Sequence, residues 1–499
     1  MVNIHDPLYA TFLKVINKHK SFNLIRRQDF VSKEGGDVAG NSLAIGNPGY
    51  CKTSGNRREV ELRWAINHKI FNLYDGGDRM DMCYFMFPSV SNFWKKPKVR
   101  TTKFGKKIIT GRKAYPVEIL IPITKDIPKK LPNNFVPFTI AVSDLDKDDL
   151  ISLLGGKFED TINAAYNYML DKVNDETTPL DYIKILESAW KVGDPDGIKL
   201  SHHGPKKLIE SVFNPLMNQG LLTSKKLSTV LDLKTILKDK KNISTLILRH
   251  CQKSFHGFLV HYFMSHIHQL LSGRGTTKKI RQKTTLVLNE ISDLLSKDSE
   301  EGSSAYSISK MISRIAKQYR TANLFLLLDT QLPGELPELK ETMKRVYVYN
   351  SSLPSVLKAM AIAGISEYAG DINQDDYSII PRLSKGWYYL FDRDAGVSIH
   401  KLEWCRSRTY LDGENFYDIY DKVFGKTSYQ NISPILEEIK KEKERSKEMW
   451  EYRKKIIAPK IVKIKKKEEK VNTEIIKEEI IEEKEPEIDY AAYAKTLTY

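Results

Sequence analysis

Short apolar runs alternate with stretches of helical spacing along most of the chain. Helical spacing over 52–66, 255–271, 303–320 and 355–363 separates many of these runs. Short apolar runs separated by helices are typical of a mainly parallel sheet with both faces covered. The pattern therefore predicts an α/β fold. The runs that we expect to form its strands are 43–46, 69–75, 117–123, 243–248, 285–288, 324–328, 345–349 and 387–391.

The same pattern predicts how the chain is divided. From residue 144 to about 240 the apolar positions follow helical spacing alone, which predicts an all-helical insertion within the α/β core. Beyond about residue 436 the composition changes to Lys, Glu and Ile, first basic and then acidic, which indicates a solvated helix or a disordered tail. We expect a lead-in (1–40), the first part of the core (41–143), the insertion (144–240), the second part of the core (241–435) and a charged tail (436–499) that offers a surface to a protein partner.

The composition favours a polyanionic partner and argues against several classes of protein. The 499 residues carry a formal net charge of +16, and such a basic chain most often binds nucleic acid. The four cysteines form no C-x-x-C pair, so we expect no zinc site and no disulfide framework, and a reducing cytoplasm fits best. No uninterrupted apolar run approaches the roughly 20 residues that a membrane-spanning helix needs, so we expect no membrane span.

The strongest basic cluster is the segment 95–130, where twelve Lys and Arg residues stand against Glu118 and Asp126. Glycines at 105 and 111 would break a helix, so we expect a loop or a ribbon. The segment contains few aromatic residues, which favours contacts with phosphates over stacking on bases. The residues that we expect to contact DNA are Lys103, Lys106, Lys107, Arg112 and Lys113.

A glycine-rich loop follows the first predicted strand. Residues 46–53 match the phosphate-binding pattern G-x-x-x-x-G-K-[ST], except that Cys51 stands in place of the second glycine. In such a loop the backbone N–H groups surround the phosphates, the lysine reaches the β- and γ-phosphates, and the hydroxyl residue binds Mg²⁺. The alternative is a Gly/Pro turn before a helix that begins with Lys-Thr. The residues that we expect to bind a nucleotide are Gly46, Asn47, Pro48, Gly49, Tyr50, Cys51, Lys52, Thr53 and Asp75, which ends the next strand.

Two further predicted strands deliver polar residues at their carboxyl ends, where an open α/β sheet binds its ligands. We assign to Glu290 the polarisation of a water for attack on the γ-phosphate, although it could instead be the first-turn acid of a helix. Asn289 precedes it, at a place where an aspartate would hold the water shell of Mg²⁺. Asp329, on the second strand, could supply the missing charge if the two strands are adjacent. Gln331 follows and is placed to sense the γ-phosphate.

Two arginines and four histidines have either a functional or a purely structural interpretation. Arg314 and Arg320, on the helix before the second of these strands, could stabilise charge at a neighbouring subunit's nucleotide. They could equally be solvated cations on a helix face. The histidines at 256, 261, 266 and 268 have no acidic or cysteine residue nearby in the sequence to complete a metal-binding set, so we expect core or surface histidines.

The order of the loop, the strand ending in Glu290 and the strand ending in Gln331 resembles that of the FtsK/HerA superfamily of DNA-pumping ATPases. That superfamily includes conjugative coupling ATPases and viral packaging ATPases, and the resemblance covers roughly 42–80 and 215–392. It implies a RecA-like P-loop core that uses ATP and Mg²⁺ and works as a hexameric ring around duplex DNA. It also implies that Lys52 and Thr53 bind phosphate and Mg²⁺, that Glu290 is catalytic, that Gln331 is the sensor, and that Arg320, with Arg314 second, acts across the ring interface.

Two departures from the family pattern bear on activity. Cys51 replaces a glycine and Asn289 replaces an aspartate. We still expect nucleotide binding, but these two replacements argue against fast hydrolysis. We expect an ATP-dependent motor on double-stranded DNA that serves DNA transfer, packaging or processing. The alternatives are a nucleotide-binding switch or scaffold on DNA and a P-loop phosphotransferase on a small substrate. The Lys-rich composition suggests an archaeal plasmid or virus as the origin.

Overall fold

The computed structural model of the 499-residue chain forms two compact units, 1–436 and 437–499, and all described residues belong to the first. The described residues are 40–65, 67–76, 98–101, 107–110, 116–124, 131, 134–193, 204–227, 229–239, 242–249, 251–273, 279–295, 304–337, 339, 342–363, 379–392 and 396–401.

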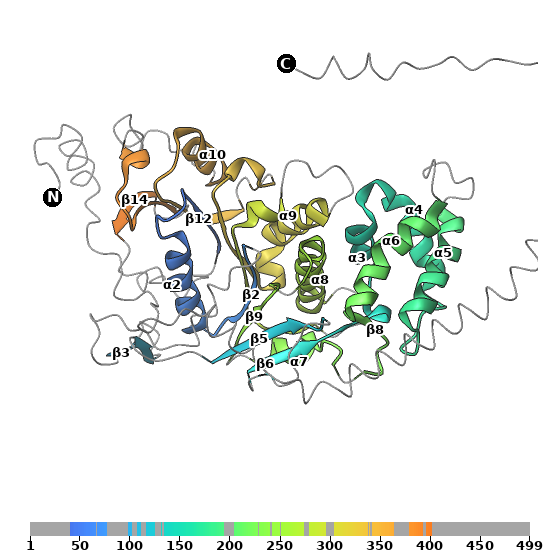
Figure 1. Ribbon diagram of the computed structural model, residues 1–499. Helices are drawn as coiled ribbons and strands as arrows, with labels where there is room; N and C mark the ends of the chain where they lie inside the picture. The colour runs from blue at the N-terminus through green and yellow to red at the C-terminus, as the bar shows by residue number, and fades with distance from the viewer. Residues whose placement is uncertain are drawn as a thin grey trace, which may run out of the picture. The chain divides into compact units, whose positions relative to one another are not determined.

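One ten-stranded sheet forms the centre of the described structure (Figure 1). Its strands, in order across the sheet, are β14 (Gly396–Lys401), β13 (Trp387–Asp392), β12 (Met343–Val348), β1 (Asn41–Ile45), β11 (Leu324–Thr330), β10 (Thr284–Asn289), β2 (Lys69–Asp75), β9 (Ile243–Leu246), β5 (Val117–Pro122) and β6 (Phe135–Phe138). Neighbours are parallel from β12 to β6, whereas β13 and β14 form an antiparallel edge. The predicted α/β fold, a RecA-like core with a mainly parallel sheet, is confirmed.

Strand burial follows from the apolar runs in the sequence. All seven residues of β11 and all five of β1 are buried, as expected for strands that are covered on both faces. The sequence prediction missed β6 and β14, the two edges of the sheet. β6 contains Pro137, which is tolerated on an edge strand because no ladder donor is required there.

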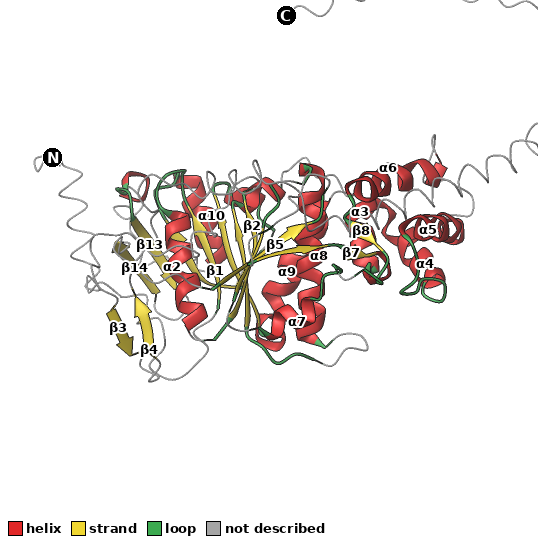
Figure 2. Ribbon diagram, turned by 60° about the horizontal axis from the view of Figure 1, so that its bottom comes forward, coloured by secondary structure: helices red, strands yellow, loops and turns green. Residues whose placement is uncertain are grey.

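Helices cover both faces of the sheet (Figure 2). Asn41 Nδ2 donates to the carbonyl of Ala316 in α9 (Ser304–Ala322) at 3.2 Å. The next residue, Ser42, donates to Glu59 Oε1 in α2 (Lys52–Ala65) at 2.7 Å. Because successive residues of a strand point to opposite faces, α2 and α9 lie on opposite sides of β1. Further helices of the core are α7 (Leu233–Lys238), α8 (Lys253–Ser272) and α10 (Leu353–Ala363).

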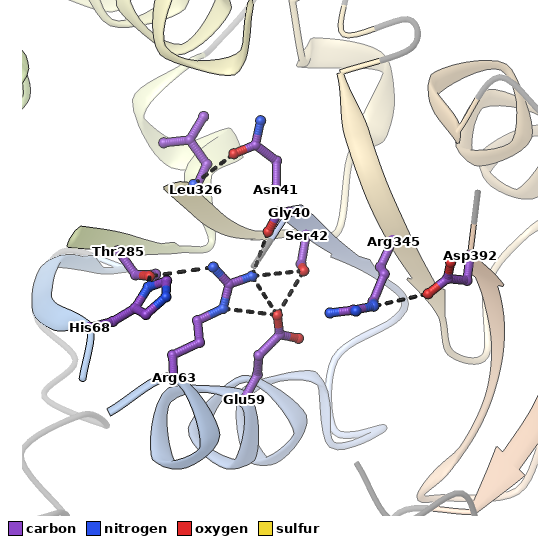
Figure 3. Close-up of polar contacts among 10 residues, drawn as sticks. All are labelled: Gly40, Asn41, Ser42, Glu59, Arg63, His68, Thr285, Leu326, Arg345 and Asp392. Atoms are coloured by element: carbon purple, nitrogen blue, oxygen red, sulfur yellow. Dashed lines mark hydrogen bonds and ion pairs between the residues drawn. The ribbon is translucent and has the colours of Figure 1, made fainter. Parts of the chain in front are cut away.

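A buried polar network fixes α2 against the sheet (Figure 3). Arg63 Nη2 donates to Glu59 Oε1 at 2.6 Å and to the carbonyl of Gly40 at 2.7 Å. Its Nη1 donates to Thr285 Oγ1 on β10 at 3.3 Å. Buried charges are tolerated only when they are paired and hydrogen-bonded, and here the pairing joins α2 to β1 and β10. The first turn of the same helix belongs to the predicted phosphate loop, so the network sets the position of that loop on the sheet.

Helices dominate the range 144–240. They are α3 (Lys147–Leu154), α4 (Glu159–Met169), α5 (Pro179–Gly193), α6 (Gly204–Gln219) and α7. Asp146 caps α3, since its side chain accepts from the N–H of Asp149 while the Asp149 side chain accepts from the N–H of Asp146. A two-residue strand, β8 (Leu222–Thr223), also lies in the range and pairs with β7 (Ile140–Ala141). α3 packs against α8 and α9 of the core.

Part of the basic segment is described. β3 (Lys98–Thr101) and β4 (Lys107–Thr110) form an antiparallel ribbon, one of the two forms that the sequence allowed. Within the described ranges, no helix combines the length and the apolar character that a membrane crossing requires.

Candidate functional site

The loop between β1 and α2 lies at the carboxyl edge of the sheet. Gly49 and Cys51 both have a φ of +79°, a left-handed conformation that glycine adopts freely and other residues adopt at a cost of about 1–2 kcal/mol. Cys51 therefore keeps the backbone conformation for which the phosphate-binding pattern uses glycine. Burial raises the pKa of its half-buried thiol, so the side chain is uncharged at neutral pH and does not repel a phosphate.

The start of the loop is held by the segment that follows β12. A Cβ added to Gly46 would lie 2.7 Å from Tyr349 Cβ, so this close approach requires glycine. Asn47 donates twice to Asn350, from its backbone N to the carbonyl at 2.7 Å and from Nδ2 to Oδ1 at 2.8 Å. No local pattern in the sequence pointed to Asn350, which stands 303 positions away from its partner.

Lys52 is buried and faces the catalytic carboxylate that the sequence predicts. Its Nζ donates to the carbonyl of Gly46 at 2.7 Å and to that of Asn47 at 3.3 Å. The same atom lies 3.8 Å from Glu290 Oε1. Thr53 follows, half-buried, in the first turn of α2, where the N–H groups and the helix dipole favour an anion. The loop therefore offers a cation, a hydroxyl and a helix N-terminus to one place.

Glu290 follows Asn289, the last residue of β10, and has a left-handed backbone and a hydrogen-bonded side chain. Its φ is +51°, which is uncommon outside glycine and is found most often where function requires it. Gln331 Nε2 donates to Glu290 Oε2 at 2.8 Å. One carboxylate oxygen thus faces Lys52 and the other faces Gln331, and the structure brings these three predicted residues together. Glu290 also stands at the N-cap of a short 3-10 helix, Ile291–Leu294, but its side chain makes no capping hydrogen bond there and is bonded to Gln331 instead.

A second layer of polar side chains lies beneath them. β10 and β11 are adjacent and parallel, which meets the condition under which Asp329 could compensate for Asn289. Asn289 Nδ2 donates to Asp75 Oδ1 at 2.6 Å, and Asp329 Oδ1 accepts from the N–H of Glu290 at 2.6 Å. Asn56 Nδ2 joins the two strands, because it donates to Asn289 Oδ1 at 2.9 Å and to Asp329 Oδ2 at 3.2 Å.

Asn56 is a residue that the sequence reading missed. It stands four positions after Lys52 in α2, so both side chains lie on the same face of the helix. This four-residue spacing from Lys52 is the feature of the sequence that could have identified Asn56. Through Asn56, α2 is bonded to the ends of both strands that deliver polar residues to the site.

Asp329 is fully buried and its charge is disfavoured. Burial, followed by the nearby Glu290 carboxylate, raises the pKa of Asp329 to about 7. Lys52 and the N–H of Glu290 act in the opposite direction. Near neutral pH the site therefore holds Asp329 in both protonation states.

The donor set fits Mg²⁺ and a nucleotide phosphate. Mg²⁺ prefers oxygen ligands and keeps several waters, and the oxygens available are those of Thr53, Asn289 and Asp329. Asn289 Oδ1 and both Asp329 oxygens already accept hydrogen bonds from the protein, so these two residues suit contact through water, and Thr53 suits direct contact. Lys52 and the left-handed loop suit the phosphates.

A pocket adjoins the outer side of the loop. Its volume is about 550 Å³, and it is lined by Pro48, Gly49 and Tyr50 from the loop and by Asn350 and residues 381–385. The pocket shares these three loop residues with the predicted phosphate site, so it has the place and the size for the base and sugar of a nucleotide.

The two predicted arginines lie away from this edge. Arg320 is in the last turn of α9, which leads into β11 at the amino edge of the sheet, and its Nε donates to Tyr319 Oη at 2.9 Å. Arg314 Nη1 donates to Asp148 Oδ2 of α3 at 3.0 Å. Gln331 stands at the other end of β11, so neither arginine joins the chain's own loop.

The predicted DNA-contacting residues mostly lie outside the described residues. Lys107 is described as the first residue of β4. The others, Lys103, Lys106, Arg112 and Lys113, are among the residues that the structure does not describe.

Three of the four histidines of α8 are buried, and the fourth is half-buried. His256 contacts the carbonyls of Leu248 and Cys251, and His268 contacts Gln318. His261 and His266, however, both face Asp149 of α3. The histidines are buried or half-buried, as expected of core or surface residues, but folding also brings in an acid, Asp149, from 117 positions away.

Comparison with known proteins gives matches among solved structures alone. No family model and no curated protein matches the sequence. The bacterial conjugative coupling protein TrwB is similar over 75% of this chain and 87% of its own, with 10% identity and a TM-score of 0.44. VirB4 of Thermoanaerobacter pseudethanolicus matches over 74% and 91%, with 11% identity and a TM-score of 0.40. The genome packaging NTPase B204 of Sulfolobus turreted icosahedral virus 2 matches over 35% and 72%, with 18% identity and a TM-score of 0.23.

Because the TM-scores are this low, nothing about function is carried over from them.

Proposed function

We propose that this chain is an ATP-hydrolysing motor that moves double-stranded DNA. The observation that carries the proposal is the meeting of Lys52, Glu290 and Gln331 at one edge of the sheet, with 3.8 Å from Lys52 Nζ to Glu290 Oε1 and 2.8 Å from Gln331 Nε2 to Glu290 Oε2. A lysine for the phosphates, with a carboxylate and an amide that can orient an attacking water, are groups that enzymes use to transfer a phosphoryl group to water.

Each residue has a separate role in the proposal. Lys52 and the N–H groups of the loop bind the phosphates, and Glu290 accepts a proton from the attacking water. Gln331 holds the carboxylate in one orientation and reports the presence of the γ-phosphate. Mg²⁺, held by Thr53 and by water on Asn289 and Asp329, would neutralise charge on the phosphate oxygens.

Double-stranded DNA is the proposed partner because of charge. The net charge of +16 and the excess of Lys and Arg in 95–130, which includes the ribbon of β3 and β4, favour a polyanion. We propose a hexameric ring in the cytoplasm, with Arg320 of one subunit acting at the nucleotide of the next. Arg314 is the second candidate for this role, because it would first have to break its ion pair with Asp148.

The test is ATP hydrolysis with and without duplex DNA, together with a sizing measurement. Duplex DNA should stimulate turnover, and Glu290→Gln should lower it by about 10²- to 10⁴-fold while nucleotide binding persists. Glu210→Gln, which changes a carboxylate paired with Lys206 on α6, is the matched control. A Glu290→Gln variant as active as the control would overturn the assignment of the catalytic base.

A second function is favoured by the departures at the site. Cys51 carries a side chain at a left-handed position beside the phosphates, and Asn289 is neutral and bonded to Asp75. Both features suit a nucleotide-binding switch or scaffold on DNA with slow hydrolysis. Nucleotide binding without DNA-stimulated turnover would support this function over the motor.

A further inference from the structure

A second cluster of ligand-type side chains lies where α3 packs on α8, away from the phosphate loop. Asp146, Asp149 and His266 each offer a ligand atom, and these atoms lie within 4.8 Å of one another. His266 Nε2 lies 2.8 Å from Asp149 Oδ2. His261, one and a half turns earlier on α8, directs Nδ1 at the other oxygen of the same carboxylate.

The contact between His261 and Asp149 is the unusual feature. His261 Nδ1 and Asp149 Oδ1 lie 3.6 Å apart, and their side chains are 2% and 0% exposed. Apart from this long contact with each other, neither atom has a hydrogen-bond partner in the described structure, although buried polar atoms are normally paired at shorter distance. Two ligands bound to one tetrahedral ion at 2.0–2.1 Å lie roughly 3.3–3.4 Å apart. The separation is therefore too long for a good hydrogen bond and close to that of two ligands of one ion.

The surroundings of the cluster support an ion rather than a chance contact. Asp146 Oδ1 accepts from the N–H of Asp149 at 2.8 Å, and its Oδ2 accepts from Gln269. Such outer contacts fix the orientation of metal ligands. Tyr262 covers the ring of His266, with the ring centroids 4.1 Å apart, while the His266 side chain remains 17% exposed and leaves a path of entry.

We propose that Asp146, Asp149, His261 and His266 bind one divalent transition-metal ion, of which Zn²⁺ is the best match. Two imidazoles and two carboxylates without a thiolate are a ligand set for Zn²⁺ and its first-row neighbours. The ligands come from both sides of the contact between α3 and α8, so the ion fastens the helical region to the core. To bind it, His266 and Asp149 separate by roughly 0.5 Å, from hydrogen-bond to ligand–ligand distance. His261, which faces Asp149 from outside the group formed by Asp146, Asp149 and His266, moves toward the other ligands.

The test uses the full chain after treatment with a chelator, titrated with Zn²⁺ alone and then with Co²⁺. We expect one Zn²⁺ per chain, a rise in the unfolding temperature, and a Co²⁺ absorption spectrum of tetrahedral type. His261→Gln and His266→Gln should each weaken Zn²⁺ binding by more than about tenfold. His268→Gln, which changes a buried histidine of the same helix outside the cluster, should leave it unchanged.

Three results would overturn the proposal. One is the absence of Zn²⁺ binding by the folded wild-type chain. Another is Zn²⁺ binding that survives both His261→Gln and His266→Gln, as binding at the phosphate loop would. The third is equal weakening in the His268→Gln control. Because no nucleotide is added, the outcome is independent of the proposed ATPase activity.

Discussion

Asp329 is the residue through which pH should act most strongly on the stability of the site. Its pKa is raised to about 7 in the folded chain, against 3.8 for an unperturbed aspartate. Between these values the folded state binds a proton that the unfolded state does not, so the free energy of unfolding falls as the pH rises. Integrated from pH 5 to pH 8, this linkage lowers the free energy of unfolding by roughly 2–3 kcal/mol.

The variant Asp329→Asn isolates this contribution. Asparagine keeps an oxygen that can accept from the N–H of Glu290, but it does not titrate. Urea unfolding of both proteins without nucleotide at pH 5, 6, 7 and 8 gives their difference in unfolding free energy. Titrating groups that do not interact with Asp329 cancel from this difference. We expect the variant to gain roughly 2–3 kcal/mol on the wild type from pH 5 to pH 8.

Asp171→Asn, which changes an exposed carboxylate at the end of α4, is the control and should show a constant difference. A difference between Asp329→Asn and the wild type that does not change with pH would refute the reasoning. It would mean that Asp329 stays ionised throughout, stabilised by Lys52 and the N–H of Glu290.

Three further predictions test the loop, the buried network and the basic segment. Cys51→Gly relieves the left-handed strain that Cys51→Ala retains, so in urea unfolding the glycine variant should be more stable than the alanine variant by roughly 0.5–1.5 kcal/mol; the reverse order would contradict the strain. Arg63→Met leaves a buried carboxylate uncompensated and should lower the free energy of unfolding by about 3–5 kcal/mol, whereas an unchanged midpoint would show that the pair contributes nothing. Neutralising three lysines of the basic segment should weaken duplex binding about equally for all sequences and reduce the salt slope, and unchanged binding would mean that these lysines do not contact DNA. The three are Lys103, Lys106 and Lys107.

The sequence was most informative where a polar residue follows a predicted strand, because this local order is enough to place the residue. Glu290 and Gln331 could be proposed because each stands within three residues of the end of an apolar run, and parallel strands deliver their carboxyl ends to one edge. Whether Asp329 could compensate for Asn289 depended on the order of strands in the sheet. Sequence spacing alone does not determine that order, and the structure makes β10 and β11 neighbours.

Contacts between distant segments could not be predicted. Asn350 and Asp149 reach their partners from 303 and 117 positions away, and no local pattern encodes such a meeting. The edge strand β6 was hidden by Pro137, which argues against a central strand but not against an edge. Helical spacing places Asn56 on the same face of α2 as Lys52. A polar residue on a helix face is usually solvated, however, and the partners of Asn56 belong to two strands that lie far away in the sequence.

The position of α9 gives the molecule a mechanical property. The helix pairs with α3 through Arg314 and Asp148, packs along β11, and leads into the strand that ends beside Gln331. Packed helices move as stiff bodies, because close-packed interiors deform little. We therefore expect a force that displaces the helical region to be transmitted along α9 to β11, the strand that ends beside Gln331. α9 is therefore the element that connects the helical region with the edge of the sheet where we propose the ATPase chemistry.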